Sequence, residues 1–99
     1  MSGYLPKPID TSEVEVPEDI KELMEIISQN THEVWSKGRM NEGWVYGERL
    51  DYQAKTHPSL VHYEELSEEE KDYDRRTSME TLKVILKMGY KIIKEENIK

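Results

Sequence analysis

Three side chains between residues 32 and 39 have the types and spacing of a small binding site. His32 and Trp35 are three residues apart, so on a helix they are neighbours on one face. Arg39 continues that face if the helix runs for another turn. An imidazole, an indole and a guanidinium together could stack on a flat heteroaromatic ring and bind a phosphate. In the alternative, Trp35 belongs to the core and His32 is an interior hydrogen-bonding group, which the residue types favour because aromatic side chains at helical spacing are mostly core.

A second aromatic group follows in the segment GWVYG, residues 43–47. In an extended strand Trp44 and Tyr46 point to one side, and Val45 points to the other. This aromatic face either fills the core between helices or lines a pocket beside His32 and Trp35. Here too the residue types favour the core.

Other kinds of site have weaker support. His57 and His62 are five residues apart and far from His32, and the chain has neither a cysteine nor a His-Glu-x-x-His pattern, so we expect no metal and no cofactor. The serines lack the context of a nucleophile elbow, and no phosphate-binding glycine loop is present, so we expect no enzyme activity. The acids of EEEK, residues 68–71, are typical of a solvated helix start. RRTS, residues 75–78, resembles a kinase site, but the start of a helix explains Thr77 and Ser78 better.

The element that must position the first site is a helix predicted over residues 17–37. Pro17 suits its first position, acids follow where the positive helix end favours them, and Gly38 is a plausible stop. Its buried stripe follows the i, i+3, i+4, i+7 spacing. The predicted stripe is Ile20, Leu23, Met24, Ile27, Thr31, Val34 and Trp35.

The rest of the chain is predicted to surround this helix. Prolines make residues 1–16 an extended N-terminal arm. Residues 39–47 form a short helical turn and then an extended piece, and the following sequence, up to residue 63, reads as a long ordered loop. Ser67 and Glu70 make a capping box that starts a second helix; Thr77 and Glu80 repeat the signal, and Gly89 ends the helical pattern. A short strand follows residue 89, and residues 94–99 form a frayed tail.

Composition limits the partners of this chain. Ninety-nine residues fit one domain, and a formal charge of −7 disfavours nucleic acid, which binds through Lys and Arg. Residues 31–63 are neutral, with four acids and four bases, and hold all three histidines and both tryptophans. With no cysteine, no signal peptide and no long apolar run, we expect a soluble cytoplasmic protein without a membrane span.

The order of several segments resembles the RyR domain, from about residue 4 to residue 93. The segments are PIDTS, HEVW, GWVYG, HPSLVHYEEL, EKDYDR and METLKVILKMGYKI. This module occurs as tandem repeats in ryanodine receptors and singly in many bacterial proteins, and the present chain resembles the single-copy bacterial type. The resemblance implies a mainly α fold, with two principal helices packed beside short strands and a long ordered loop.

The resemblance also implies a function. The family is not catalytic, and in receptor repeats a His-x-x-Trp motif and a following Arg help to bind adenine nucleotide and drug-like ligands; these match His32, Trp35 and Arg39. Receptor repeats pair with pseudo-twofold symmetry, so a single copy is expected to form a homodimer. The sequence thus predicts a non-enzymatic module for an adenine-nucleotide-like small molecule, and the alternative is a protein-interaction or self-association module. In the first interpretation Trp35 stacks on the base. The remaining predicted contacts are Arg39, Arg49 and Lys55 for phosphate, and Trp44, Tyr46 and Tyr63 for the wall.

Overall fold

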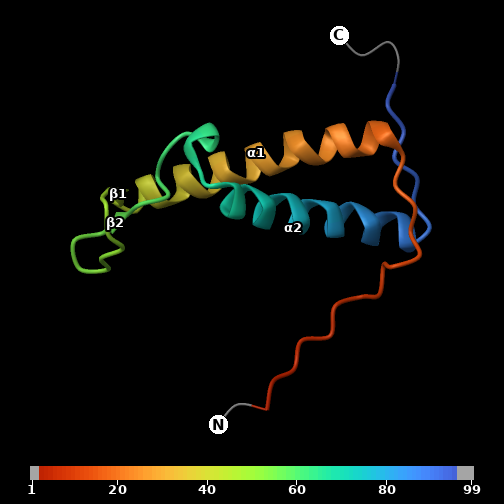
Figure 1. Ribbon diagram of the computed structural model, residues 1–99, viewed down its shortest axis with the longest axis horizontal. Helices are drawn as coiled ribbons and strands as arrows, with labels where there is room; N and C mark the ends of the chain where they lie inside the picture. The colour runs from red at the N-terminus through yellow and green to blue at the C-terminus, as the bar shows by residue number, and fades with distance from the viewer. Residues whose placement is uncertain (1–2, 96–99) are drawn as a thin grey trace.

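The structure, a computed structural model, describes residues 3–95. Two long helices lie side by side, with a small sheet and its loops at one end and the N-terminal arm at the other (Figure 1). The predicted mainly α fold with short strands is confirmed. The elements in chain order are α1 (Glu18–Asn41), β1 (Val45–Tyr46), β2 (Thr56–His57), the 3-10 helix η1 (Tyr63–Glu65) and α2 (Glu68–Lys87).

Helix α1 begins at Glu18, one residue later than the sequence predicts. Pro17 precedes the first helical position, and its carbonyl accepts from the N–H groups of Ile20 and Lys21. The predicted stop at Gly38 is wrong, because the helix continues to Asn41. The end lies at Gly43, which has φ +96° and suits the left-handed turn that closes a helix. There the N–H of Gly43 donates to the carbonyl of Met40, and the N–H of Trp44 donates to that of Arg39.

Helix α2 is one continuous helix. Its predicted capping box is confirmed: Ser67 Oγ accepts from the N–H of Glu70, and the Glu70 carboxylate accepts from the N–H of Ser67. The prediction of a second helix start at Thr77 is wrong. Because neither Gly nor Pro interrupts residues 68–87, the helix continues through Thr77. The cap-like sequence at Thr77 therefore does not mark the start of a helix. The predicted end at Gly89, with φ +96°, is confirmed.

The strands β1 and β2 are parallel, pairing Val45 with Thr56 and Tyr46 with His57. Gly47 is required beside them, because a Cβ atom there would collide with the Thr56 side chain. The aromatic face predicted for GWVYG is only half correct, since Trp44 is 6% exposed but Tyr46 is 53% exposed. Residues 90–95 contain no strand, contrary to prediction, and residues 96–99 of the predicted tail lie outside the described residues.

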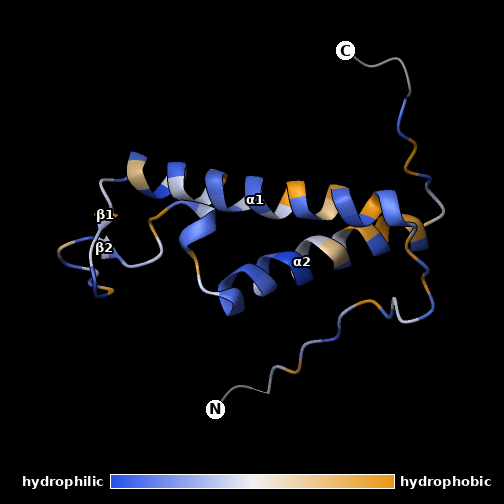
Figure 2. Ribbon diagram, turned by 45° about the horizontal axis from the view of Figure 1, so that its top comes forward, coloured by the Kyte–Doolittle hydropathy of each residue, from blue (hydrophilic) through white to orange (hydrophobic). Residues whose placement is uncertain are grey.

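The helices pack through an apolar end and a polar middle. Figure 2 shows the apolar segments in the first half of α1 and the last half of α2. Further along, Ser28 is fully buried; its Oγ donates to the carbonyl of Met24 at 2.8 Å and lies 3.2 Å from Ser78 Oγ on α2. Because these hydrogen bonds satisfy their hydroxyl groups, two serines can lie in the helix interface, where the hydrophobic spacing predicted larger apolar side chains.

The buried face of α1 therefore differs from the predicted stripe. Val34 is 62% exposed and Thr31 is exposed too, so both assignments are wrong. Ser28 and His32 occupy the buried positions instead. Within the described part of the chain, no helix has the length and apolarity needed to cross a membrane.

Candidate functional site

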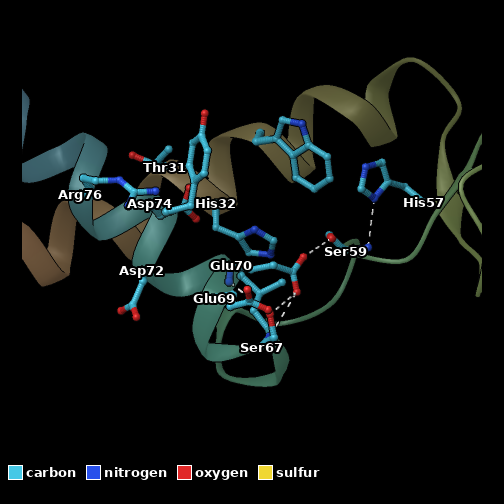
Figure 3. A pocket seen from close by; sticks show the side chains of 13 residues that line it. Thr31, His32, His57, Ser59, Ser67, Glu69, Glu70, Asp72, Asp74 and Arg76 are labelled. Carbon is cyan, nitrogen blue, oxygen red and sulfur yellow. Dashed lines mark hydrogen bonds between the residues drawn. The ribbon is translucent and has the colours of Figure 1, made fainter. Parts of the chain in front are cut away.

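A cleft of about 1000 Å³ opens beside the second half of α1 and the first half of α2 (Figure 3). Helix α1 contributes Thr31, His32 and Trp35, and the end of β2 with its following turn contributes His57 and Ser59. The remaining lining residues come from α2 and the segment before it. They are Leu66, Ser67, Glu69, Glu70, Asp72, Tyr73, Asp74 and Arg76.

His32 is held in one orientation at the inner wall of the cleft. It is 4% exposed, and its Nε2 lies 2.7 Å from the carbonyl oxygen of Val61. Because a carbonyl oxygen only accepts, Nε2 carries the proton and donates it. Ser36 Oγ lies 3.5 Å from the same nitrogen. His32 is thus the interior hydrogen-bonding group of the structural interpretation, and it also lines the cleft.

Trp35 supplies a flat aromatic wall. Its ring centroid lies 5.7 Å from that of His32, with the two planes 29° apart. The ring of His57 also contacts it, in a T-shaped arrangement with centroids 4.9 Å apart. These contacts fix the indole while the side chain remains partly exposed, as a surface for stacking a planar ligand requires.

The predicted cations lie outside the cleft. Arg39 lies over the ring of Trp44, with its guanidinium carbon 5.1 Å from the centroid, and pairs with Glu42 at 3.6 Å. Lys55 Nζ donates to the carbonyl of Glu42 at 2.8 Å. Arg49 is exposed in the loop between the strands. The structure therefore groups these bases around β1 and the end of α1, and brings none of them to the cleft beside Trp35.

The other predicted wall residues are also elsewhere. Trp44 is buried beneath Arg39, and Tyr46 is exposed. Tyr63 is buried, and its hydroxyl donates to Glu25 Oε2 at 3.2 Å. Burial raises the pKa of the Tyr63 hydroxyl, and the neighbouring Glu25 carboxylate adds to that effect. Of the eight residues predicted for the site, the structure brings only His32 and Trp35 into the cleft.

Glu70 is a cleft residue that sequence reasoning assigned to helix capping alone. Its carboxylate accepts from Ser67 and also from the hydroxyl of Ser59, so it ties α2 to the turn after β2 (Figure 3). The Ser59 hydrogen bond is the main cause that lowers the pKa of Glu70. The capping box was the only signal of this residue, because the partner Ser59 is eleven positions away.

Asp74 follows Glu70 by one helical turn and faces the same cleft. Within residues 3–95 it makes no hydrogen bond and no ion pair. Burial raises the pKa of the Asp74 carboxyl; His32 lowers it and Glu70 raises it further. The sequence pattern did not predict Asp74 as a cleft residue, because an acid followed by two arginines is typical of a solvated helix surface.

An ion network behind the cleft holds the two helices together. Arg75 on α2 donates through Nε to Glu25 on α1 at 2.9 Å, and through Nη1 to Asp72 at 2.8 Å and Glu68 at 3.3 Å. The hydrogen bonds to these carboxylates raise the pKa of Arg75. The arginine therefore stays charged, and it engages Asp72 at the rim of the cleft.

The charge of the cleft is negative. Its lining includes four carboxylates, those of Glu69, Glu70, Asp72 and Asp74, against the single guanidinium of Arg76. Among residues 3–95 no group of three His, Asp or Glu side chains has the arrangement of a metal site. Chemically, the cleft offers an aromatic wall for a flat ring and acceptors for hydrogen-bond donors.

Comparison with protein families gives a match over nearly the whole chain. The family model described as the RyR domain matches residues 4–94. The match includes both helices, the strands and every residue that lines the cleft.

Proposed function

Because the chain belongs to the RyR domain family, we propose that it is a non-enzymatic ligand-binding module whose ligand is an adenine-nucleotide-like small molecule. The family resemblance implies that a His-x-x-Trp motif helps to form a ligand site. The observation that carries the proposal is that His32 and Trp35 line one cleft of about 1000 Å³. That volume is at the upper end of the range typical of small-molecule sites.

The ring of the ligand stacks on Trp35 in this proposal. Stacking of a base on an aromatic side chain contributes on the order of 1–3 kcal/mol. The rings of His57 and His32 both contact the indole, so little side-chain freedom is lost when the ligand binds. The amino group of an adenine would find acceptors in the carboxylates of Glu70 and Asp74 on the opposite helix.

The phosphates of such a ligand are not assigned to the cleft. Arg39, Arg49 and Lys55, the cations expected to meet them, lie around β1 and away from the Trp35 wall. Four carboxylates in the lining would repel an anion. We therefore assign only the ring to the cleft, with the phosphates directed out through its mouth into solvent.

Calorimetric titration of the purified chain with adenosine and with ATP tests this proposal. Wild type is expected to bind at millimolar ligand or below, and Trp35→Ala is expected to weaken adenosine binding by about tenfold or more, which corresponds to about 1.4 kcal/mol. The matched control is Val34→Ala, one position away on the same helix but exposed and outside the cleft. That variant should bind adenosine as wild type does.

Two results would count against the proposal. If neither compound produces heat or a melting shift at millimolar concentration, the nucleotide interpretation fails. If Trp35→Ala loses its cooperative melting while Val34→Ala keeps it, Trp35 is a core residue rather than a wall of the site. Trp35→Phe then keeps a ring in place and shows whether binding follows stacking area.

A second candidate function, a protein-interaction or self-association module, has one observation in its favour. Apolar side chains gather in exposed positions at and after β1, where a partner chain could cover them. They are Val45, Tyr46, Leu50 and Tyr52. This candidate requires association with a protein and makes no use of the Trp35 cleft, so the adenosine titration separates the two.

A further inference from the structure

The carboxylates around the cleft differ in how far other groups compensate their charge. Glu70 accepts hydrogen bonds from Ser59 and Ser67, and Asp72 pairs with Arg75 at 2.8 Å. Asp74 has neither a hydrogen bond nor an ion pair within the described residues. It is also partly buried, so water screens its charge less than that of an exposed acid.

The one guanidinium in the lining does not offset this charge. Arg76 lies over the ring of Tyr73, with its guanidinium carbon 5.6 Å from the centroid, and it is exposed. Trp35 lines the same cleft as Asp74, from α1 on the other helix. A cation between an aromatic face and a carboxylate is attracted by both, through the negative face of the ring and through the opposite charge.

We propose that the cleft discriminates between ring ligands by charge, and that it favours a flat heteroaromatic ring carrying a positive charge, with Asp74 as the counter-charge and Trp35 as the stacking face. This inference rests on the proposed ring-binding function and adds the chemical class of the ring. It assigns the counter-charge to Asp74. The charge of Glu70 is already compensated by hydrogen bonds from Ser59 and Ser67, and Glu70 holds the Ser59 turn against α2.

Three related compounds test the selectivity. Adenosine is neutral, 1-methyladenosine carries a positive charge on the same ring at neutral pH, and adenosine 5′-monophosphate adds an anion. The affinity order expected from calorimetry at low ionic strength is 1-methyladenosine first, adenosine second and the monophosphate last. The cation should bind at least about threefold more tightly than adenosine, the lower range for a partly exposed charge pair. The advantage should shrink as salt is added.

Asp74→Asn tests the assigned counter-charge. This variant should lose most of the preference for 1-methyladenosine over adenosine, because the Asn amide oxygen still accepts a hydrogen bond but carries no negative charge. Its control is Glu22→Gln, which removes the same charge from an exposed position of α1 outside the cleft and should keep the preference. Asn and Asp have similar helix propensities, so the helix itself is little affected.

The outcomes separate this inference from the function on which it rests. If adenosine binds, and the monophosphate binds as tightly as 1-methyladenosine or more tightly, ring binding stands and the charge selectivity is overturned. If Asp74→Asn keeps the full preference for the cation, the assignment of Asp74 is overturned. If none of the three compounds binds, the ring-binding function itself fails and the selectivity falls with it.

Discussion

At the residue scale, the cleft depends on a few side chains whose surroundings make them more than surface groups. His32 holds the loop through the carbonyl of Val61 and at the same time supports the indole of Trp35. A single residue thus links the fold to the wall of the cleft. Structural and functional interpretations of His32 are for this reason not exclusive.

Asp74→Asn should stabilise the domain at neutral pH. Burial raises the pKa of Asp74 in the folded state above its value in the unfolded chain. The folded state therefore binds the proton more readily, and stability gains from this group as pH falls through the window between about 3.9 and the raised pKa. Asn lacks the unfavourable charge at pH 7, and we expect a gain of about 0.5 kcal/mol or less.

Thermal unfolding of wild type and Asp74→Asn across pH 3 to 7 measures this effect. The difference in melting temperature should favour the variant at pH 7 and disappear at the acid end, where Asp74 is protonated in both states. A difference that is constant with pH, or that favours wild type at pH 7, would contradict the assignment. Glu22→Gln again serves as the control for net charge.

The pKa shift of Glu70 is opposite in direction to that of Asp74. The hydrogen bond from Ser59 lowers its pKa in the folded state, so its contribution to stability is present at neutral pH and is lost as pH falls through the lowered pKa. The two acids, one turn apart on α2, therefore respond oppositely to acid. The capping box marks Glu70 in the sequence, but the opposite pKa shifts of the two acids follow only from their contacts in the folded structure.

At the element scale, a glycine inside α1 and a glycine just after it differ in whether their backbone conformation requires the absence of a side chain. Gly38 lies inside the helix, and a Cβ atom there would have no heavy atom within 4 Å. Gly43 follows the helix with φ +96°, a conformation that side chains with a Cβ rarely adopt. The position of the helix end therefore depends on Gly43 and not on Gly38.

Gly38→Ala should raise the free energy of unfolding by about 0.5–1 kcal/mol, since Ala loses less conformational freedom in a helix. Gly43→Ala should lower it by roughly 1–2 kcal/mol, because the left-handed backbone is strained for Ala. Urea unfolding of both variants measures the two changes. If Gly38→Ala destabilised the domain as much as Gly43→Ala, the helix could not continue through residue 38.

The sequence predicted the elements better than the face each one buries. Amphipathic spacing located α1, and the capping box located the start of α2. The same spacing placed Val34 inside, whereas Ser28 and His32 are buried in its stead, because hydrogen bonds to Met24, Ser78 and Val61 satisfy them. Such partners lie far away in sequence and leave no periodic signal.

The candidate site was predictable only on its α1 side. His32 and Trp35 are neighbours by helical spacing, so their proximity follows from the sequence. Which residues share the cleft with them depends on how α2 packs against α1, and the sequence does not show that packing. The packing places Glu70 and Asp74 in the cleft, and Arg39 and Lys55 lie outside it. The predicted cation-lined site and the observed acidic cleft differ for this reason.

At the scale of the whole molecule, the predicted homodimer remains a proposal with a direct test. The chain exposes apolar side chains at both of its ends as well as around β1, among them Leu5, Ile93 and Tyr52. Its formal charge of −7 makes two copies repel each other, so added salt should favour association. Light scattering at high micromolar concentration should give twice the mass of one chain.

A mass of one chain at every salt concentration would contradict the dimer. Tyr52→Ser is the informative variant, because Tyr52 is exposed and contacts the edge of Trp44 without lining the cleft. If that variant became monomeric while wild type dimerised, the surface around β1 would be the interface. Adenosine binding should be unchanged in it.

The two tryptophans of this chain allow the central claim, that the cleft beside Trp35 binds a planar ring, to be tested in one measurement. Trp35 lines the cleft, whereas Trp44 is buried beneath Arg39 outside it. Each gives one indole N–H signal in a ¹H–¹⁵N correlation spectrum, and Trp35→Phe assigns them. Titration with adenosine should move the Trp35 signal progressively and the Trp44 signal much less. A spectrum in which neither signal moves at millimolar adenosine, or in which only Trp44 moves, would contradict the claim.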